Sequence, residues 1–130
     1  MTEQTLRPIN IQLHSRSREL ELEYANGQSF HLGCEYLRVY SPSAEVVGHG
    51  PGEEVLQTGK MNVGIKAIKP VGNYAIQLEF DDGHDSGIYS WDYLYRLGTE
   101  MQQRWQNYLS RMEAEGANRD PDVQVIKLGL

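Results

Sequence analysis

Residues 80–94 read Phe-Asp-Asp-Gly-His-Asp-Ser-Gly-Ile-Tyr-Ser-Trp-Asp-Tyr-Leu, and they decide the fold. Before them, apolar and polar residues alternate over 74–80, which is the period of a strand with one buried face. The Asp-Gly pair then indicates a tight turn, and Ser90 can cap a helix that begins near Trp91. The stretch therefore predicts a hairpin that leads directly into a helix.

The same order of signals occurs earlier in the chain. Apolar residues alternate with glutamates over 19–24, an Asn-Gly pair follows at 26–27, and the alternation then resumes. Asn-Gly favours a type I′ turn, which needs positive φ at both central residues. An acid-Tyr-Leu sequence stands at 35–37 and again at 92–94. This repetition predicts two similar hairpin–helix halves that share one antiparallel sheet, although Asn-Gly and Asp-Gly are also common hairpin turns in their own right.

Periodicity assigns the remaining segments: a strand at 9–13, one or two helical turns at 34–40, a long loop at 41–60, a strand at 63–67, and an amphipathic helix from 91 to about 114 with a break at Gly98. The predicted fold class is α+β, an antiparallel sheet built from β-hairpins with a C-terminal helix packed on or beside it. We expect one domain over residues 1–117, with its core at about 9–97. Residues 118–130 form a tail that could be a last strand or a loose segment.

Composition excludes several classes of function. The chain of 130 residues suits one domain, and its net charge of −6 opposes broad attraction to nucleic acid or to anionic lipid. It has a single cysteine, Cys34, and its N-terminus lacks the apolar run of a secretory signal. No apolar run is long enough to cross a bilayer. We therefore expect a cytoplasmic protein with no nucleic-acid or membrane partner.

Two stretches together carry a family resemblance. Residues 37–46 read Leu-Arg-Val-Tyr-Ser-Pro-Ser-Ala-Glu-Val, and with residues 80–94 they resemble the N-terminal domain of gamma-butyrobetaine hydroxylase. Gly-His-Gly-Pro at 48–51 and Gly-Ile-Tyr-Ser-Trp at 87–91 make the chain most similar to small stand-alone bacterial proteins of that family, which have no assigned activity. The catalytic domain of the hydroxylase is absent here, so the resemblance implies a module that is not an enzyme.

The resemblance also indicates which residues of this chain correspond to a zinc site. In the hydroxylase domain a Cys-Pro-Cys-x-x-Cys run and a later histidine bind zinc. This chain has Ser41, Ser43 and Val46 at the three cysteine positions, while His84 matches the histidine. Because a structural zinc site needs about four thiolate or imidazole ligands, firm zinc binding is not expected and no cofactor is predicted.

His84 keeps two alternative roles. It could bind zinc or iron weakly together with Asp82, Asp85 or His49, since imidazole and carboxylate groups suit both metals. Alternatively, it lies at a hairpin tip and forms hydrogen bonds with its acidic neighbours or with the turn at 41–43. The sequence favours the second alternative. Under the first alternative, the chain would be a small metal-binding protein centred on His84.

No catalytic residues are predicted. The glycines around 48–60 do not match a phosphate-binding loop, and no Gly-x-Ser-x-Gly sequence occurs. Cys34 lies at a predicted helix N-terminus, where a thiol can become reactive, but a lone cysteine is more often a small buried residue.

A protein-interaction or accessory role is the preferred function. Related domains are fused to Mrp-type P-loop iron–sulfur cluster carriers, which implies by analogy a partner in cluster handling, or an oxygenase. The predicted contact residues are those of the glycine-rich loop, Gly48, His49 and Gly50, and three aromatic residues, Tyr89, Trp91 and Tyr95. The aromatic residues could equally be core, because an aromatic stripe on a helix usually faces a sheet. The sequence does not indicate the oligomeric state.

Overall fold

The computed structural model describes residues 6–126 and residue 128. Its strands form two three-stranded antiparallel sheets, with order β1-β2-β3 and β4-β5-β6. The elements are β1 (Asn10–His14), β2 (Glu19–Glu23), β3 (Ser29–Gly33), α1 (Cys34–Val39), α2 (Ala44–Val47), β4 (Ile65–Val71), β5 (Ala75–Phe80), β6 (Ile88–Ser90), α3 (Trp91–Thr99) and α4 (Met101–Ala114). The α+β class and the hairpin–helix halves are confirmed, but the expectation of one shared sheet is wrong.

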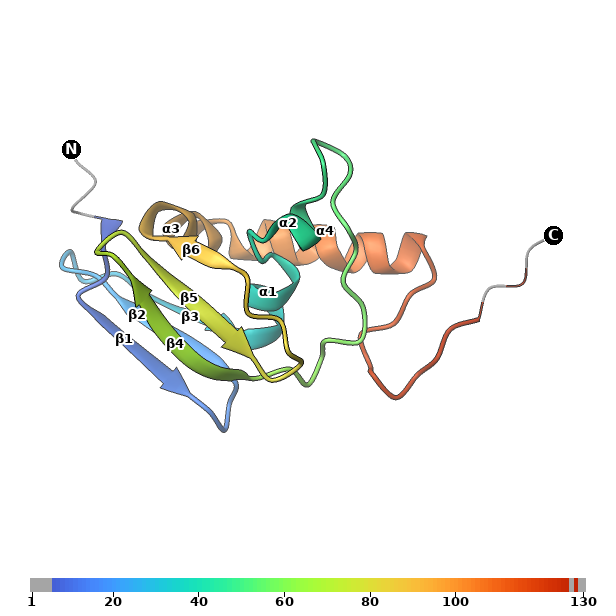
Figure 1. Cartoon of the computed structure of the whole chain (residues 1–130), viewed down its shortest axis with the longest axis horizontal. Coiled ribbons are helices and arrows are strands. Elements are labelled where there is room, and N and C mark those ends of the chain that lie inside the picture. Colours follow the sequence, from blue (N-terminus) through green and yellow to red (C-terminus); the bar gives the residue numbers. More distant parts are fainter. Residues whose placement is uncertain (1–5, 127, 129–130) are drawn as a thin grey trace.

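One hydrophobic core joins the two sheets. Its fully buried side chains come from both, and from the helices that follow each: Leu20, Leu22, Leu32, Leu37, Leu78, Leu94 and Leu97. Each such leucine stabilises the fold by about 1.5–3 kcal/mol relative to an exposed one. Figure 1 shows the strands gathered at one end of the molecule, with α4 extending away from them. Trp105 is packed against this core and lies edge-on to Tyr36 of α1.

The turns of the two halves are built in the same way. Gly27 and Gly83 have φ of 90° and 92°, and each amide donates to the carbonyl three residues earlier. Asn26 Oδ1 accepts from the Gln28 amide at 2.9 Å, and Asp82 Oδ1 accepts from the His84 amide at 3.1 Å. Asn26 itself keeps a negative φ, so the predicted type I′ turn is wrong. The side-chain hydrogen bond holds the asparagine in an Asx turn instead.

The two helices that follow the hairpins are tied together reciprocally. Tyr36 of α1 donates its hydroxyl proton to the carbonyl of Leu97 at 2.7 Å. Tyr93, which has the same place in α3, donates to the carbonyl of Tyr40 at 2.6 Å. Position 97 follows Tyr93 by four residues, as position 40 follows Tyr36. The two helices therefore make equivalent contacts with each other, in the two similar halves that the repeated acid-Tyr-Leu sequence predicted.

The C-terminal segment after α4 is attached to the body of the protein. The amides of Gly59 and Met61 donate to the carbonyls of Asn118 and Arg119, at 2.9 and 3.0 Å. The Arg119 guanidinium forms a two-pronged ion pair with Glu35 and lies over the ring of Trp105. Within the described part of the segment no strand is formed, and residues 127 and 129–130 lie outside the described residues. Arg119 is thus the residue that fixes the segment, and the sequence did not indicate it.

Among the described residues, no helix combines the length and apolar character that a membrane span requires.

Candidate functional site

The two halves differ in chemistry at the end of α1. In the first half, Phe30 packs so closely on α3 that a Cβ on Gly98 would lie 2.3 Å from its ring. The equivalent positions in the second half are Ser86 and Ser41, which are polar. A contact that is purely apolar in one half is therefore a cluster of hydrogen-bonding groups in the other.

We call this group the serine–histidine cluster: Ser41, Ser43, Glu45, His84 and Ser86. Ser41 Oγ and His84 Nε2 share a hydrogen bond of 2.8 Å, and His84 Nδ1 lies 3.3 Å from Glu45 Oε1. The two remaining serines share a hydrogen bond of 2.8 Å, and Ser86 donates to Glu45 at 3.1 Å. Both nitrogens of the His84 ring therefore have a partner within the cluster.

Local sequence places these groups together. Pro42 lies in the short link between α1 and α2. Ser43 then caps α2, because its hydroxyl oxygen accepts a hydrogen bond from the Glu45 amide at 3.3 Å. Opposite, Gly87 allows the close approach of the chain, because a Cβ there would lie 2.5 Å from Ser41 Oγ. Of the two partners expected for His84, its acidic neighbours or the turn at 41–43, the ring hydrogen bond to the turn is present.

An ion pair covers one side of the cluster. Asp82 accepts from Arg38 Nε at 2.8 Å and from Lys60 Nζ at 2.6 Å, and Arg38 also donates to Gln57 at 3.0 Å. Partial burial acts to raise the pKa of Asp82, but the hydrogen bonds from Lys60, the His84 amide and Arg38 outweigh it and lower that pKa to about 2. Because Arg38 is only 7% exposed, its charge depends on this partner.

The three positions that match the cysteines of the hydroxylase domain hold two hydroxyl groups and one alkyl group. Ser41 and Ser43 are used in hydrogen bonds, and the Val46 side chain is buried in α2. The Asp82 carboxylate faces Arg38 and Lys60. Within residues 6–126 and 128, no group of three histidine, cysteine, aspartate or glutamate side chains could hold a metal ion. Asp85 and His49 are therefore not brought to His84 as a ligand set.

A hydroxyl, an imidazole and a carboxylate stand in a row in the cluster, as they do in some hydrolases. Ser41 is only 1% exposed, however, and its oxygen also accepts from the Ser43 amide at 3.2 Å. Such a hydroxyl cannot reach a substrate in this conformation. Burial likewise raises the pKa of Cys34 and makes its thiol less reactive. The arrangement is suited to holding the turn, the hairpin and α2 in one geometry.

The predicted contact aromatics have different places. Tyr89 is fully buried and donates to the Leu37 carbonyl at 2.6 Å, so it belongs to the core and is not available to a partner. Trp91 and Tyr95 are half-buried, and donate to the Asn73 carbonyl and to Gln28 at 2.8 Å each. The loop residues Gly48, His49 and Gly50 come directly after α2, where the chain projects beyond that helix in Figure 1.

His84 should make the folded protein sensitive to mild acid. Burial of the imidazole, and then the nearby Arg38 charge, lower the pKa of His84 below its ordinary value of 6.5. As the pH falls through that value, the unfolded chain takes up the proton first. The free energy of unfolding therefore falls until the folded imidazole is protonated as well.

We expect the urea midpoint of the unaltered protein to drop more between about pH 7 and pH 5 than that of His84→Gln. The matched control is His49→Gln, which changes an exposed histidine of the loop and should keep the unaltered pH dependence. Equal slopes for His84→Gln and the unaltered protein would show that His84 is not the acid-sensitive group.

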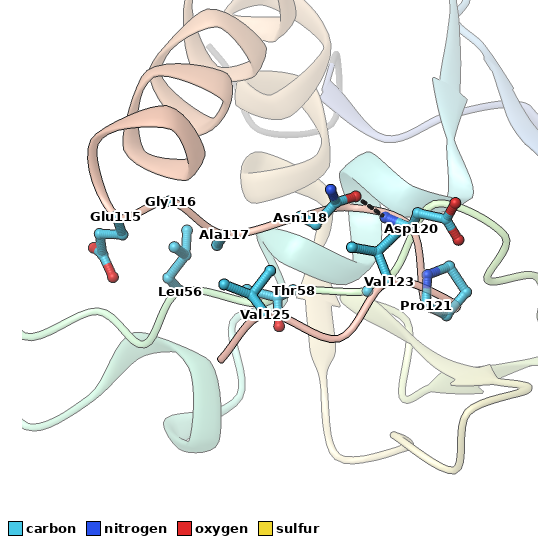
Figure 2. Close-up of a pocket in the computed structure, with 11 residues that line it drawn as sticks. Leu56, Thr58, Glu115, Gly116, Ala117, Asn118, Asp120, Pro121, Val123 and Val125 are labelled. Atoms are coloured by element: carbon cyan, nitrogen blue, oxygen red, sulfur yellow. Dashed lines mark hydrogen bonds between the residues drawn. The ribbon is translucent and has the colours of Figure 1, made fainter. Parts of the chain in front are cut away.

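A hollow of about 490 Å³ lies between the loop and the C-terminal segment. Figure 2 shows Leu56 and Thr58 of the loop together with labelled residues of the C-terminal segment, among them Ala117 and Val125, and Asn118 accepts from the Asp120 amide at 2.8 Å. The sequence did not predict this hollow, because its two sides come from a loop and a tail that have no periodic pattern.

Comparisons with known proteins agree with the resemblance. The family model described as gamma-butyrobetaine hydroxylase-like, N-terminal, matches residues 11–95. Two proteins with NMR solution structures are 53% and 51% identical to the chain, with TM-scores of 0.78 and 0.76. The first alignment covers 95% of this chain and 97% of the other, and the second covers 100% and 99%.

A crystal structure from Acidithiobacillus ferrooxidans is 38% identical, with a TM-score of 0.61, over 75% of this chain and 98% of the other. It is described as a protein of unknown function from the DUF971 family. The curated proteins contain no match to the chain. The matched region corresponds to an N-terminal domain and not to a catalytic one, and it includes both hairpins and the serine–histidine cluster. By this match and these identities, the chain belongs to the gamma-butyrobetaine hydroxylase-like N-terminal family.

Proposed function

We propose that this protein is a non-catalytic accessory module that binds a larger protein through the loop at residues 41–60. The observation that carries the proposal is the exposure of two valines on a loop of fixed shape. Val47 and Val55 are 43% and 51% exposed, and the Val55 amide donates to the carbonyl of Val46 at 2.8 Å, which places the two side chains near each other.

The loop is held at its base by several contacts. Gly48 has φ of 80°, and it lies so close to the returning part of the loop that a Cβ at this position would be 2.1 Å from the Glu53 carbonyl oxygen. Tyr108 of α4 donates to the Gln57 carbonyl at 2.6 Å, and Arg111 donates to the Glu54 carbonyl at 3.2 Å. A preformed loop loses little conformational entropy on binding, which favours a role in recognition.

The resemblance favours a partner in iron–sulfur cluster handling, such as a P-loop cluster carrier, or an oxygenase. Buried hydroxyls in the serine–histidine cluster and a buried Cys34 support a role without catalysis. The serine–histidine cluster would then act as the support of the loop, because Ser43 and Glu45 belong to the turn from which the loop starts.

The test compares two double variants in affinity capture followed by reconstitution. Val47→Ser/Val55→Ser removes the apolar pair, while Ile9→Ser/Ile88→Ser removes two isoleucines that are 69% and 49% exposed elsewhere on the surface. A partner captured by the unaltered protein is then purified and its Kd measured with each variant. We expect a loss of affinity of about tenfold or more for the valine variant and little change for the isoleucine variant.

A third variant replaces Gly48–Gly52 with a serine-rich segment of equal length. If the partner binds all of these variants with the same Kd as the unaltered protein, the loop is not the docking surface and the proposal is wrong.

A further inference from the structure

A second cavity, which we call the arginine cavity, lies beneath the loop. Its volume is about 350 Å³, within the size range of small-molecule sites. Its walls are mainly apolar and come from the end of α1, from α2, from the loop at 54–57, and from α3 and α4: Val39, Tyr40, Val46, Val47, Val55, Leu56, Tyr93 and Tyr108. The cavity thus offers a shaped apolar surface in a protein that otherwise carries a net negative charge.

Most polar groups of the cavity are already used by the protein. The hydroxyls of Tyr40, Tyr93 and Tyr108 each donate to a backbone carbonyl at 2.6 Å. Gln57 accepts from Arg38 through its oxygen and donates to the Val55 carbonyl through its nitrogen. A neutral ligand would therefore find few hydrogen-bonding groups here.

Two guanidinium groups remain as donors. Arg104 donates to Glu100 through Nε at 2.8 Å, while its guanidinium lies 5.3 Å from the ring centre of Tyr40 and 5.7 Å from that of Tyr93. The two Nη groups of Arg104 take no part in the hydrogen bond to Glu100. Arg111 donates one Nη to the carbonyl of Glu54 at 3.2 Å.

The remaining charged group of the lining is directed elsewhere. The Glu54 carboxylate accepts from the Gly52 amide at 3.4 Å, within the loop itself. The cationic groups of the lining are therefore Arg104 and Arg111, and each also pairs with a carboxylate four residues away on α4 or at its ends, Glu100 at 2.8 Å and Glu115 at 3.5 Å. A guanidinium binds a carboxylate most strongly when the pair is partly removed from water, and the Arg104 side chain is only 20% exposed.

The geometry points to a binding site for a small organic carboxylate with an apolar body. The apolar part would lie against the valines and tyrosine rings, and the carboxylate would accept hydrogen bonds from Arg104, with Arg111 at the edge. This site shares Val47 and Val55 with the proposed docking surface, but its polar recognition comes from α4, so substitutions of the arginines test it separately.

The test uses hexanoate as the probe, with hexanamide and hexylammonium as matched neutral and cationic controls. Binding is followed by the amide signals of the ¹⁵N-labelled protein. We expect saturable shifts around Val46, Val55 and Arg104 with a Kd on the order of 1 mM for hexanoate. Hexanamide should bind at least about tenfold more weakly, because it cannot form a charge-assisted pair. Hexylammonium should not produce these shifts.

Three variants complete the test. Arg104→Gln should weaken hexanoate binding about tenfold and Arg111→Gln about threefold, while Arg16→Gln, which alters an exposed arginine in the turn after β1, should have no effect. If Arg104→Gln disturbs the fold, the contrast between hexanoate and hexanamide in the unaltered protein still decides. Equal binding of these two probes, or no saturable shift at the cavity with hexanoate, would overturn the inference.

Discussion

Replacing Ser41, Ser43 and Val46 together with cysteine is expected to create a protein that holds one zinc ion per chain. Ser41 Oγ is 2.8 Å from His84 Nε2, Ser43 Oγ is 2.8 Å from Ser86 Oγ in the same hairpin segment, and Val46 is a buried residue of α2, which Ser43 caps. Three thiolates and one imidazole form a complete tetrahedral set, for which apparent binding free energies of about 10–16 kcal/mol are typical in small zinc domains. The expected gain in zinc affinity is therefore of several orders of magnitude.

Zinc content after gel filtration measures this gain, and cobalt substitution reports thiolate ligands by their charge-transfer absorption. The control is the same triple variant with His84→Ala, which should bind zinc much more weakly. A triple variant that retains no more zinc than the unaltered protein would show that the cluster does not occupy the position of the family's metal site.

Replacing Asp82 with alanine is expected to lower the free energy of unfolding by roughly 3 kcal/mol, because it leaves the buried Arg38 charge without its partner. The loss of the hydrogen bond to the His84 amide adds to this cost. Urea unfolding measures the change, and Asp85→Ala is the matched control: its exposed carboxylate should contribute within about 0.5 kcal/mol.

A double variant separates the charge from other effects. In Arg38→Met/Asp82→Ala the uncompensated charge is removed, so we expect part of the lost stability to return. In the unaltered protein, the contribution of Asp82 is present above the unfolded-state pKa of 3.8 and is lost as the pH falls from there towards 2, below the window in which His84 acts. If Asp82→Ala and Asp85→Ala have equal stabilities, the Arg38–Asp82 pair does not support the site.

Local sequence predicted much of the fold because its signals act over a few residues. The alternation at 19–24 and 74–80, the Ser90 cap and the repeated acid-Tyr-Leu sequence correspond to β2, β5, the start of α3 and the two similar halves. The long loop was predicted, but not the single helical turn of α2 within it. Four residues cannot show a helical period, so this turn depends on the Ser43 cap.

Long-range features could not be predicted from the same signals. Alternation tells which face of a strand is buried but not which strand lies beside it, so two sheets and one sheet look alike in the sequence. Likewise, Tyr89 and Trp91 have the same aromatic character, and only the packing of α1 over β6 shows that Tyr89 is core.

The candidate site was predicted in part. A hydrogen bond from His84 to the turn at 41–43 was one of the two alternatives that the sequence left open, and the structure contains it. The roles of Arg38 and Lys60 were missed, since they are 44 and 22 residues away from Asp82. The arginine cavity was missed because its lining also comes from distant parts of the chain. Arg104 and Arg111 belong to α4, and they line a cavity only because residues 54–57 of the loop lie beside them.

The metal content of the unaltered, tag-free protein after equilibration with zinc and with iron(II) tests directly whether His84 is a metal ligand. Because the His84 ring is already paired with Ser41 and Glu45, we expect far less than one metal ion per chain after gel filtration, with no difference between the unaltered protein and His84→Ala. One tightly retained ion per chain that disappears in His84→Ala would contradict this expectation.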